Sequence, residues 1–238
     1  MVLDIKSDDD LFRVIQSEAR EVKSQEPIMT TFIDATVLSE SVHSFQDIIS
    51  LTIAHRLVMS CGSNPSVCVN QVRNIIRNAF DSEELEMGHT MLDAVQEDVV
   101  AVKRRDPACC TLLEVILFYK GFASLVCHRA ARRNWNKKTE NGMKSRFVSL
   151  LLQSQASAAF GLDIHPAASI GSGVLLDHGT GVVIGETATV GDGCTLLHGV
   201  TLGGSGKVRV RLLHANTLFY INQSYTSGRW RSTPKGRS

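Results

Sequence analysis

Apolar side chains recur at helical spacing from about residue 8 to residue 160. The first stripe follows an acidic start at Ser7–Asp10, and it consists of Leu11, Ile15, Ala19 and Val22. Further stripes predict helices that begin at Pro27 and Pro65, and helices over about residues 45–57, 92–105, 112–135 and 145–159. We therefore expect an α-helical N-terminal domain over residues 1–160, in which each stripe packs against another helix.

A second period begins after Phe160, where an aliphatic residue returns at every sixth position apart from one step of eight. These aliphatic residues are Ile164, Ile170, Leu176, Ile184, Val190, Leu196 and Leu202. A period of six is too short for a repeat built of helices, and it favours a chain in which each unit forms one flat side of a triangular prism. The predicted fold class is α+β, with a left-handed parallel β-helix over residues 161–207 that is cut short.

The hexad pattern stops at Lys207, and the composition changes there. The last 32 residues carry seven basic side chains and no acidic one, whereas residues 1–206 carry 18 basic and 24 acidic side chains. We expect residues 208–238 to form an atypical basic tail that is disordered. Because this tail is unlike the repeat that precedes it, we interpret it as an alternative C-terminus.

The composition argues against several classes of function. The net charge of +1 and the lack of a recognisable binding module argue against a nucleic-acid partner. The most apolar stretch, Leu112 to Val126, contains Glu114 and Lys120, so we predict no membrane span. The six cysteines form no CxxC pair and follow no signal peptide, which indicates free thiols and a cytoplasmic protein. The histidines of the helical segments have no partner at metal-ligand spacing, so we predict no metal site.

The segment 176–181, Leu-Asp-His-Gly-Thr-Gly, departs from the hexad pattern just before the eight-residue step. Asp177 and His178 follow the inward-facing Leu176 and are expected to face outward beside a protruding loop. Asp163 lies 15 residues before His178, close to one coil of the prism, and stacked coils lie ~4.8 Å apart. A carboxylate there can hydrogen-bond one imidazole nitrogen and leave the other to accept a proton. His178 is thus a candidate general base oriented by Asp163, and a structural histidine at a corner is the alternative.

A longer resemblance includes these residues. The runs DIHPAA, LDHGTGVVIGETA and HGVTLGG closely resemble the serine O-acetyltransferases of the hexapeptide-repeat acyltransferase family. The upstream segments AVKRRDPAC and FYKGF are similar to the helical domain of that family, so the resemblance covers about residues 8–207. It implies transfer of the acetyl group of acetyl-CoA to the hydroxyl of L-serine. The products would be CoA and O-acetylserine, in the first step of cysteine biosynthesis from serine.

The resemblance also implies residue roles. His178 matches the catalytic base and Asp163 matches its orienting partner, while Asp106 and Asp177 match the carboxylates that bind the amino group of serine. The turn that meets acetyl-CoA matches Gly203, Gly204, Ser205, Gly206 and Lys207. No cofactor or metal is implied, because acetyl-CoA is a co-substrate and a thioester needs no metal for activation.

The resemblance implies a homotrimer or hexamer. The Asp-Arg-His-Pro motif that follows the glycine-lysine turn in this family is missing, and we interpret the nearby Arg209, Arg211 and His214 as coincidental. The C-terminal peptide that docks into O-acetylserine sulfhydrylase is also missing, which argues against that partner. Two alternatives stay open: a catalytically impaired or regulatory isoform that co-assembles with full-length subunits, and an acyltransferase for another small hydroxyl acceptor.

Overall fold

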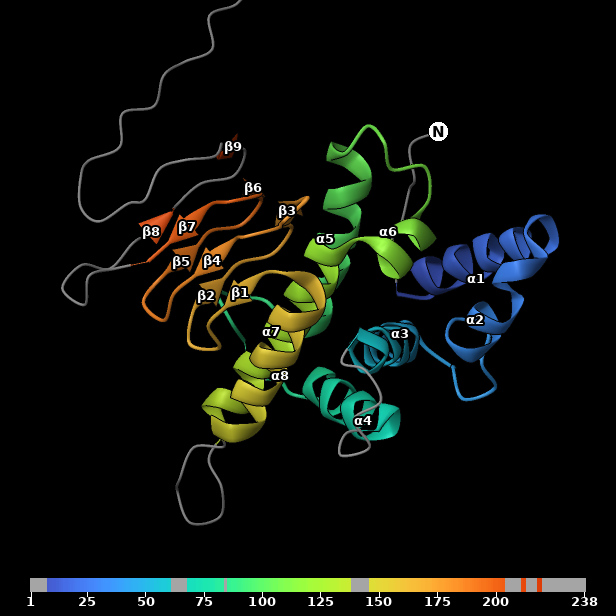
Figure 1. Ribbon diagram of the computed structural model, residues 1–238, viewed down its shortest axis with the longest axis horizontal. Helices are drawn as coiled ribbons and strands as arrows, with labels where there is room; N and C mark the ends of the chain where they lie inside the picture. The colour runs from blue at the N-terminus through green and yellow to red at the C-terminus, as the bar shows by residue number, and fades with distance from the viewer. Residues whose placement is uncertain are drawn as a thin grey trace, which may run out of the picture.

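The computed structural model describes residues 8–60, 68–83, 85–137 and 146–203, together with residues 211–212 and 218–219. Helices fill one side of the molecule and short strands fill the other (Figure 1). The helices are α1 (Asp8–Gln25), the 3₁₀ helix η1 (Pro27–Met29), α2 (Thr30–Ala35), α3 (Phe45–Ser60), α4 (Val69–Phe80), α5 (Met91–Arg105), α6 (Leu112–Phe118), α7 (Lys120–Asn136) and α8 (Arg146–Phe160). The predicted start of a helix at Pro65 lies outside the described residues.

Local signals in the sequence start two of these helices. Before α5, the Thr90 hydroxyl accepts a hydrogen bond from the Asp93 N–H at 3.1 Å, and the Asp93 carboxylate accepts one from the Thr90 N–H at 3.1 Å. Before α6, the Thr111 hydroxyl accepts from the Glu114 N–H at 3.1 Å. Such caps satisfy backbone donors that the first helical turn leaves without a partner, so both helices begin at fixed residues.

The prediction of one helix over residues 112–135 is wrong at a single point. Tyr119 has an extended conformation with ψ 110°, so α6 ends before it and α7 begins after it. The guanidinium of Arg56 in α3 donates to the carbonyl oxygens of Ile116, Phe118 and Tyr119 at 3.2 to 3.4 Å, which satisfies acceptors at the end of α6. The apolar stripe shows no sign of this break, because Arg56, which stabilises the break, lies 60 positions before Ile116 in the chain.

Strands of two or three residues form the other side of the molecule. They are β1 (Asp163–Ile164), β2 (Ser169–Ile170), β3 (Leu175–Asp177), β4 (Val183–Ile184), β5 (Thr189–Val190), β6 (Thr195–Leu197), β7 (Thr201–Leu202), β8 (Arg211–Leu212) and β9 (Leu218–Phe219). They form three parallel sheets in the orders β1-β4-β7, β2-β5-β8 and β3-β6-β9. Each sheet is one side of a prism, and the fold is the left-handed parallel β-helix that the hexad pattern predicts.

The register of the prism shows where the chain departs from strict hexads. Asp163 of β1 faces Val183 of β4, a step of 20 residues, whereas Val183 faces Thr201 of β7, a step of 18. The two additional residues lie between β3 and β4, in the turn that contains His178. The hexad aliphatics are buried as predicted, and none of them is more than 5% exposed.

Strands β8 and β9 lie within residues 208–238, for which the sequence predicts a disordered tail. β8 pairs with β5 and β9 pairs with β6, so four residues of this segment add to the stack. The remaining residues of this segment lie outside the described part of the chain, and their disorder stays a prediction.

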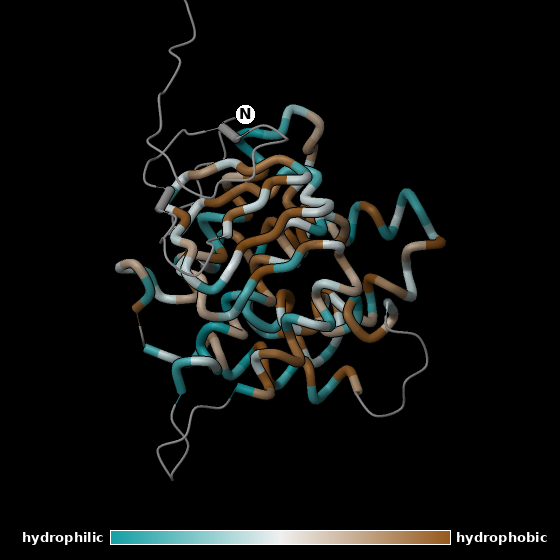
Figure 2. The backbone as a smooth tube through the Cα atoms, turned by 60° about the vertical axis from the view of Figure 1, so that its left-hand side comes forward, coloured by the Kyte–Doolittle hydropathy of each residue, from teal (hydrophilic) through white to brown (hydrophobic). Residues whose placement is uncertain are grey.

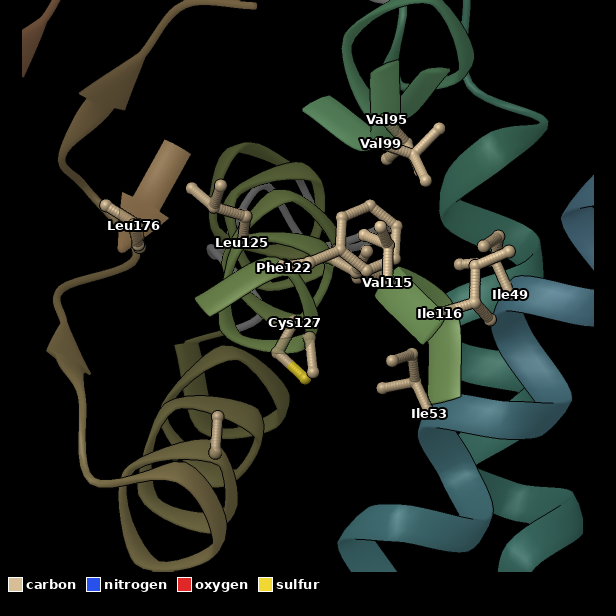
Figure 3. Packing of buried hydrophobic residues seen from close by; sticks show 14 of the residues in the cluster. Ile49, Ile53, Val95, Val99, Val115, Ile116, Phe122, Leu125, Cys127 and Leu176 are labelled. Carbon is tan, nitrogen blue, oxygen red and sulfur yellow. The ribbon is translucent and has the colours of Figure 1, made fainter. Parts of the chain in front are cut away.

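One apolar cluster joins the helices to the prism (Figure 3). Phe122 and Leu125 of α7 lie between Val115 and Ile116 of α6 on one side and Leu176 of β3 on the other. Burial of each such side chain contributes about 1.5–3 kcal/mol. Apolar and polar segments alternate along the coils of the prism (Figure 2), as its inward and outward positions require. No helix in the described ranges is long and apolar enough to cross a membrane.

A buried ion pair ties two helices to the first coil of the prism. Arg129 of α7 and Asp98 of α5 lie 2.7 Å apart, with side chains 5% and 0% exposed. Arg129 also donates to the carbonyl oxygens of Ile170 and Gly171 at 3.2 and 2.7 Å, and Asp98 accepts from the Val174 N–H at 2.9 Å. Burial raises the pKa of the Asp98 carboxyl, and the Arg129 cation opposes this rise. These contacts fix α5 and α7 against the coil that carries the candidate site.

Candidate functional site

His178 lies in the turn that follows β3, and its backbone is strained. Its φ is +55°, in the left-handed region that residues other than glycine rarely adopt. The Gly179 N–H donates to the Asp177 carbonyl oxygen at 2.6 Å, and the Thr180 N–H donates to the His178 carbonyl oxygen at 2.8 Å. Strained residues gather at functional sites, so the turn supports the choice of His178 as a candidate base.

The imidazole of His178 projects from the prism, with its side chain 78% exposed. Its Nε2 lies 3.9 Å from Oδ1 of Asp177, which is beyond hydrogen-bond distance. The ring of His198, which follows β6 in the next coil, lies edge-on to it with the ring centroids 6.3 Å apart. A small substrate can therefore reach His178, with a carboxylate and a second imidazole beside it.

Asp163 begins β1, and its carboxylate is held from the helical side. Its Oδ1 accepts a hydrogen bond from Nε2 of Gln153 in α8 at 2.7 Å. Within the described ranges, the predicted hydrogen bond between Asp163 and His178 is not formed. Their chain neighbours nevertheless lie close together, because a Cβ on Gly179 would lie 2.8 Å from Cδ2 of Leu162. The orienting role of Asp163 stays a prediction.

Asp106 directly follows α5 and is half-buried. Its Oδ1 accepts from the Ala108 N–H at 2.8 Å, and its Oδ2 accepts from the Tyr119 hydroxyl at 2.8 Å. Burial, and then the hydrogen bond to Asp106, raises the pKa of the Tyr119 hydroxyl, which stays protonated at neutral pH. The carboxylate therefore has one fixed direction, and its remaining lone pairs can accept from a ligand.

Arg105 brings Asp106 to the prism. Its Nη1 donates to the Gly173 carbonyl oxygen at 3.0 Å, and it lies 3.4 Å from the Cys194 carbonyl oxygen and from Oγ1 of Thr195. These atoms belong to or adjoin the side formed by β3 and β6, and β3 ends at Asp177. Arg105, the neighbour of Asp106, thus lies against the side of the prism that contains Asp177. The joint role of Asp106 and Asp177 in binding an ammonium group stays a prediction.

A small cavity lies beneath the candidate site, and its lining includes Ser124, His128, Gln153 and Leu162. Burial, followed by the cations of Arg129 and Arg132, lowers the pKa of His128 to about 3. His128 is therefore neutral at physiological pH. Because its ring is enclosed, it does not offer a substrate a second base.

The predicted acetyl-CoA turn is described only at its first residue. A Cβ on Gly203 would have no atom within 4 Å, and Gly204, Ser205, Gly206 and Lys207 lie outside the described residues. The same holds for Arg209 and His214, while Arg211 belongs to β8. In the described ranges, no group of three or more histidine, cysteine or acidic residues is arranged to hold a metal. The absence of a metal and of a cofactor from the reaction stays a prediction.

Four residues that contact the candidate site were not singled out from the sequence: Arg105, Tyr119, Lys120 and Gln153. Nζ of Lys120 donates to the hydroxyl of Thr180, inside the His178 turn. The segment FYKGF, which contains Tyr119 and Lys120, resembles the family, but that resemblance gave neither residue a role. Their contacts cannot be derived from spacing, because Lys120 and Thr180 are 60 positions apart.

Comparisons with known proteins point to one family. A family model described as "Serine acetyltransferase, N-terminal" matches residues 11–127. Serine acetyltransferase 4 of Arabidopsis thaliana is 40% identical over 199 residues, which are 84% of this chain and 51% of that protein. Probable serine acetyltransferase 4 of Oryza sativa subsp. japonica is 42% identical over 201 residues, which are 84% of this chain and 58% of that protein.

Solved structures extend the match to the fold. Soybean serine acetyltransferase complexed with serine is 36% identical with a TM-score of 0.71, and the match covers 83% of this chain and 74% of the soybean chain. A serine acetyltransferase in complex with CoA is 34% identical with a TM-score of 0.72, and the match covers 84% and 77% of the two chains. The chain spans only 51%, 58% and 59% of the length of three curated relatives. On the strength of the family model and the solved structures, the chain belongs to the serine acetyltransferase family.

Proposed function

We propose that this chain transfers the acetyl group of acetyl-CoA to the hydroxyl of L-serine, which yields O-acetylserine and CoA. The observation that supports this best is the contact of Arg105, the neighbour of Asp106, with the side of the prism that contains Asp177 and leads into the turn of His178. Carboxylates suit the ammonium group of an amino acid, and an exposed imidazole suits the removal of a hydroxyl proton. The relatives solved with serine and with CoA support this substrate pair.

In this proposal, Asp106 and Asp177 bind the ammonium group of serine through charge-assisted hydrogen bonds. His178 accepts the hydroxyl proton while the serine oxygen attacks the carbonyl carbon of the thioester. The tetrahedral intermediate then expels the CoA sulfur, and the imidazolium of His178 returns the proton to it. The acetyl group moves from sulfur to oxygen and the proton moves from oxygen to sulfur, so no further reactant is needed.

The test is CoA release from acetyl-CoA by the purified chain, read with a thiol reagent. Cys68 and Cys110 are exposed free thiols, so the protein without acetyl-CoA is the blank. We expect release that depends on L-serine and that L-threonine or glycerol does not replace. Release with those acceptors at the same rate would indicate an acyltransferase for another hydroxyl. No release with L-serine, by a chain that co-assembles with a full-length relative, would favour the catalytically impaired isoform.

We also propose a homotrimer or hexamer for the assembly. Exposed apolar side chains on one face of α8 support this, since Phe147, Leu150 and Leu151 are 89%, 40% and 40% exposed. Sedimentation of the purified chain tests it, and a single monomer peak at micromolar concentration would contradict it.

For the location we propose the cytoplasm, on the composition of the sequence. Relatives in Arabidopsis thaliana include proteins named as chloroplastic and mitochondrial. Imaging of a chain tagged at its C-terminus tests the proposal, and fluorescence in either organelle would contradict it.

A further inference from the structure

Three consecutive residues between α6 and α7 each contact a different part of the candidate site. They are Tyr119, Lys120 and Gly121, named here the 119–121 bridge. The bridge is held firmly from the helical side: the Tyr119 N–H donates to the Val115 carbonyl oxygen at 3.2 Å, and the Tyr119 carbonyl oxygen accepts from the Ala123 N–H at 3.1 Å. Such a segment, fixed by both flanking helices, can transmit their position to the residues that it contacts.

Tyr119 contacts the carboxylate that the helical domain contributes. Its hydroxyl donates to Oδ2 of Asp106 at 2.8 Å, while the Ala108 N–H donates to Oδ1 at 2.8 Å. One donor on each oxygen leaves the carboxylate a single orientation. Because burial and this hydrogen bond raise the pKa of Tyr119, the hydroxyl remains a donor throughout the neutral range.

Lys120 contacts the turn that carries His178. Its ammonium group donates to the hydroxyl of Thr180. The Thr180 N–H donates to the His178 carbonyl oxygen at 2.8 Å, and the Thr180 carbonyl oxygen accepts from the Gly199 N–H at 2.8 Å. The turn is therefore tied both to the next coil of the prism and, through Lys120, to the helical domain.

Gly121 contacts the strand that ends at Asp177. A Cβ on Gly121 would lie 2.0 Å from the carbonyl oxygen of Leu176 and 2.9 Å from its Cβ, which is closer than atoms can approach. Only glycine lets the start of α7 come so near to β3. The separation between the bridge and Asp177 is therefore set by backbone contact.

We propose that the 119–121 bridge is a positioning element that sets the geometry between Asp106, Asp177 and His178. Tyr119 fixes the ammonium-binding carboxylate of Asp106, Lys120 fixes the turn of His178, and Gly121 sets the distance from both to Asp177. The proposal rests on the proposed function, since it assigns the bridge a role in serine binding and in proton transfer. Tyr119 and Lys120 are positioning residues, because they act through residues that touch the substrate.

Tyr119→Phe tests the link to serine binding. This variant keeps the ring and loses only the hydroxyl, so we expect the KM for L-serine to rise about three- to tenfold and the KM for acetyl-CoA to stay constant. Calorimetric titration with L-serine should show the same loss of affinity. In the Asp106→Asn background, Tyr119→Phe should have no further effect, because its partner is already altered.

Lys120→Met tests the link to the base. We expect kcat to fall about tenfold with a smaller change in the KM for L-serine, because the variant displaces the turn of His178 and leaves Asp106 in place. Lys137→Met, at the opposite end of α7, is the matched control and should leave both constants unchanged. The proposal would be overturned if Tyr119→Phe lowered kcat and Lys120→Met raised the KM for L-serine.

The outcomes separate this proposal from the proposed function. If the wild-type chain neither binds L-serine nor releases CoA, the proposed function is wrong and the role of the bridge falls with it. If the wild-type chain is active and Tyr119→Phe keeps its KM for L-serine, the proposed function stands and the bridge is overturned. A fall in melting temperature with unchanged kinetic constants would likewise reduce the bridge to a structural segment.

Discussion

The helical domain and the prism are stabilised in different ways. Helices α3 and α7 have 16 and 17 residues, and each satisfies most of its backbone hydrogen bonds internally. The prism strands have two or three residues, and each of β1 to β7 depends on a strand 18 or 20 positions away in the neighbouring coil. The helical domain is therefore stabilised by the packing of long helices. In the prism every coil repeats the same structure, so a residue that departs from the repeat is free to serve function.

The candidate site lies where these two regions meet, and each contributes different residues to it. The prism supplies His178, on an exposed turn that the repeat does not require. The helical domain supplies Asp106 and the rigid contacts around it, from Tyr119 and Arg105. The comparison predicts that exposed residues of the prism affect turnover and that buried contacts with the helices affect stability.

The largest expected effect is a loss of turnover with little change in stability. His178→Ala should lower turnover by about 10²–10⁴, the usual contribution of a positioned base. Thermal unfolding should change little, because the side chain is 78% exposed. CoA release and circular dichroism measure the two quantities, and His198→Ala is the control, with a smaller loss of turnover. Wild-type turnover in His178→Ala would remove the assigned base.

The next effect tests stability at the junction. Arg129→Met leaves the fully buried Asp98 carboxylate without its cation, so we expect the free energy of unfolding to fall by about 3–5 kcal/mol. The double variant Asp98→Leu with Arg129→Met should recover much of this loss, because no charge then remains buried. Urea denaturation measures both variants. A single variant as stable as the wild type would show that the ion pair does not tie the helices to the prism.

A smaller effect depends on pH. The pKa of His128 is lowered from the ordinary 6.5 of histidine to about 3 in the folded chain, mainly by burial and then by Arg129 and Arg132. Its neutral form therefore contributes stability that is present above pH 6.5 and lost as the pH falls towards 3, at about 1 kcal/mol per pH unit. His128→Gln should unfold with a shallower dependence on pH between 6 and 4 than the wild type. Parallel curves for the two proteins would contradict the neutral, buried state.

The smallest expected effect concerns the link between α8 and the prism. Gln153→Leu removes the donor to Asp163, so turnover should fall about three- to tenfold if Asp163 orients His178. Ser154→Ala, at the adjacent exposed position, should leave turnover unchanged. The effect of Gln153→Leu should vanish in the Asp163→Asn background. Additive effects of the two substitutions would show that Gln153 acts elsewhere.

Local repetition made much of the prism predictable from the sequence. The burial of Ile164 or Leu196 follows from the period of six, because each unit repeats the same environment and needs no knowledge of distant residues. The step of eight likewise located the additional turn between β3 and β4, and with it His178. The amphipathic stripes identified the helices for the same reason, since a helical face is a property of neighbouring positions.

Tertiary structure decided the features that join distant positions. The stripe through residues 112–135 contains no sign of the break at Tyr119, because Arg56 stabilises that break from α3. The sequence placed Asp163 and His178 within one coil, yet the packing of α8 lets Gln153 donate a hydrogen bond to the Asp163 carboxylate. Lys120 reaches Thr180, and Arg105 reaches Gly173, across 60 and 68 positions. Such contacts depend on how a helix end meets a strand in space, and hydrophobic periodicity contains no information about that distance.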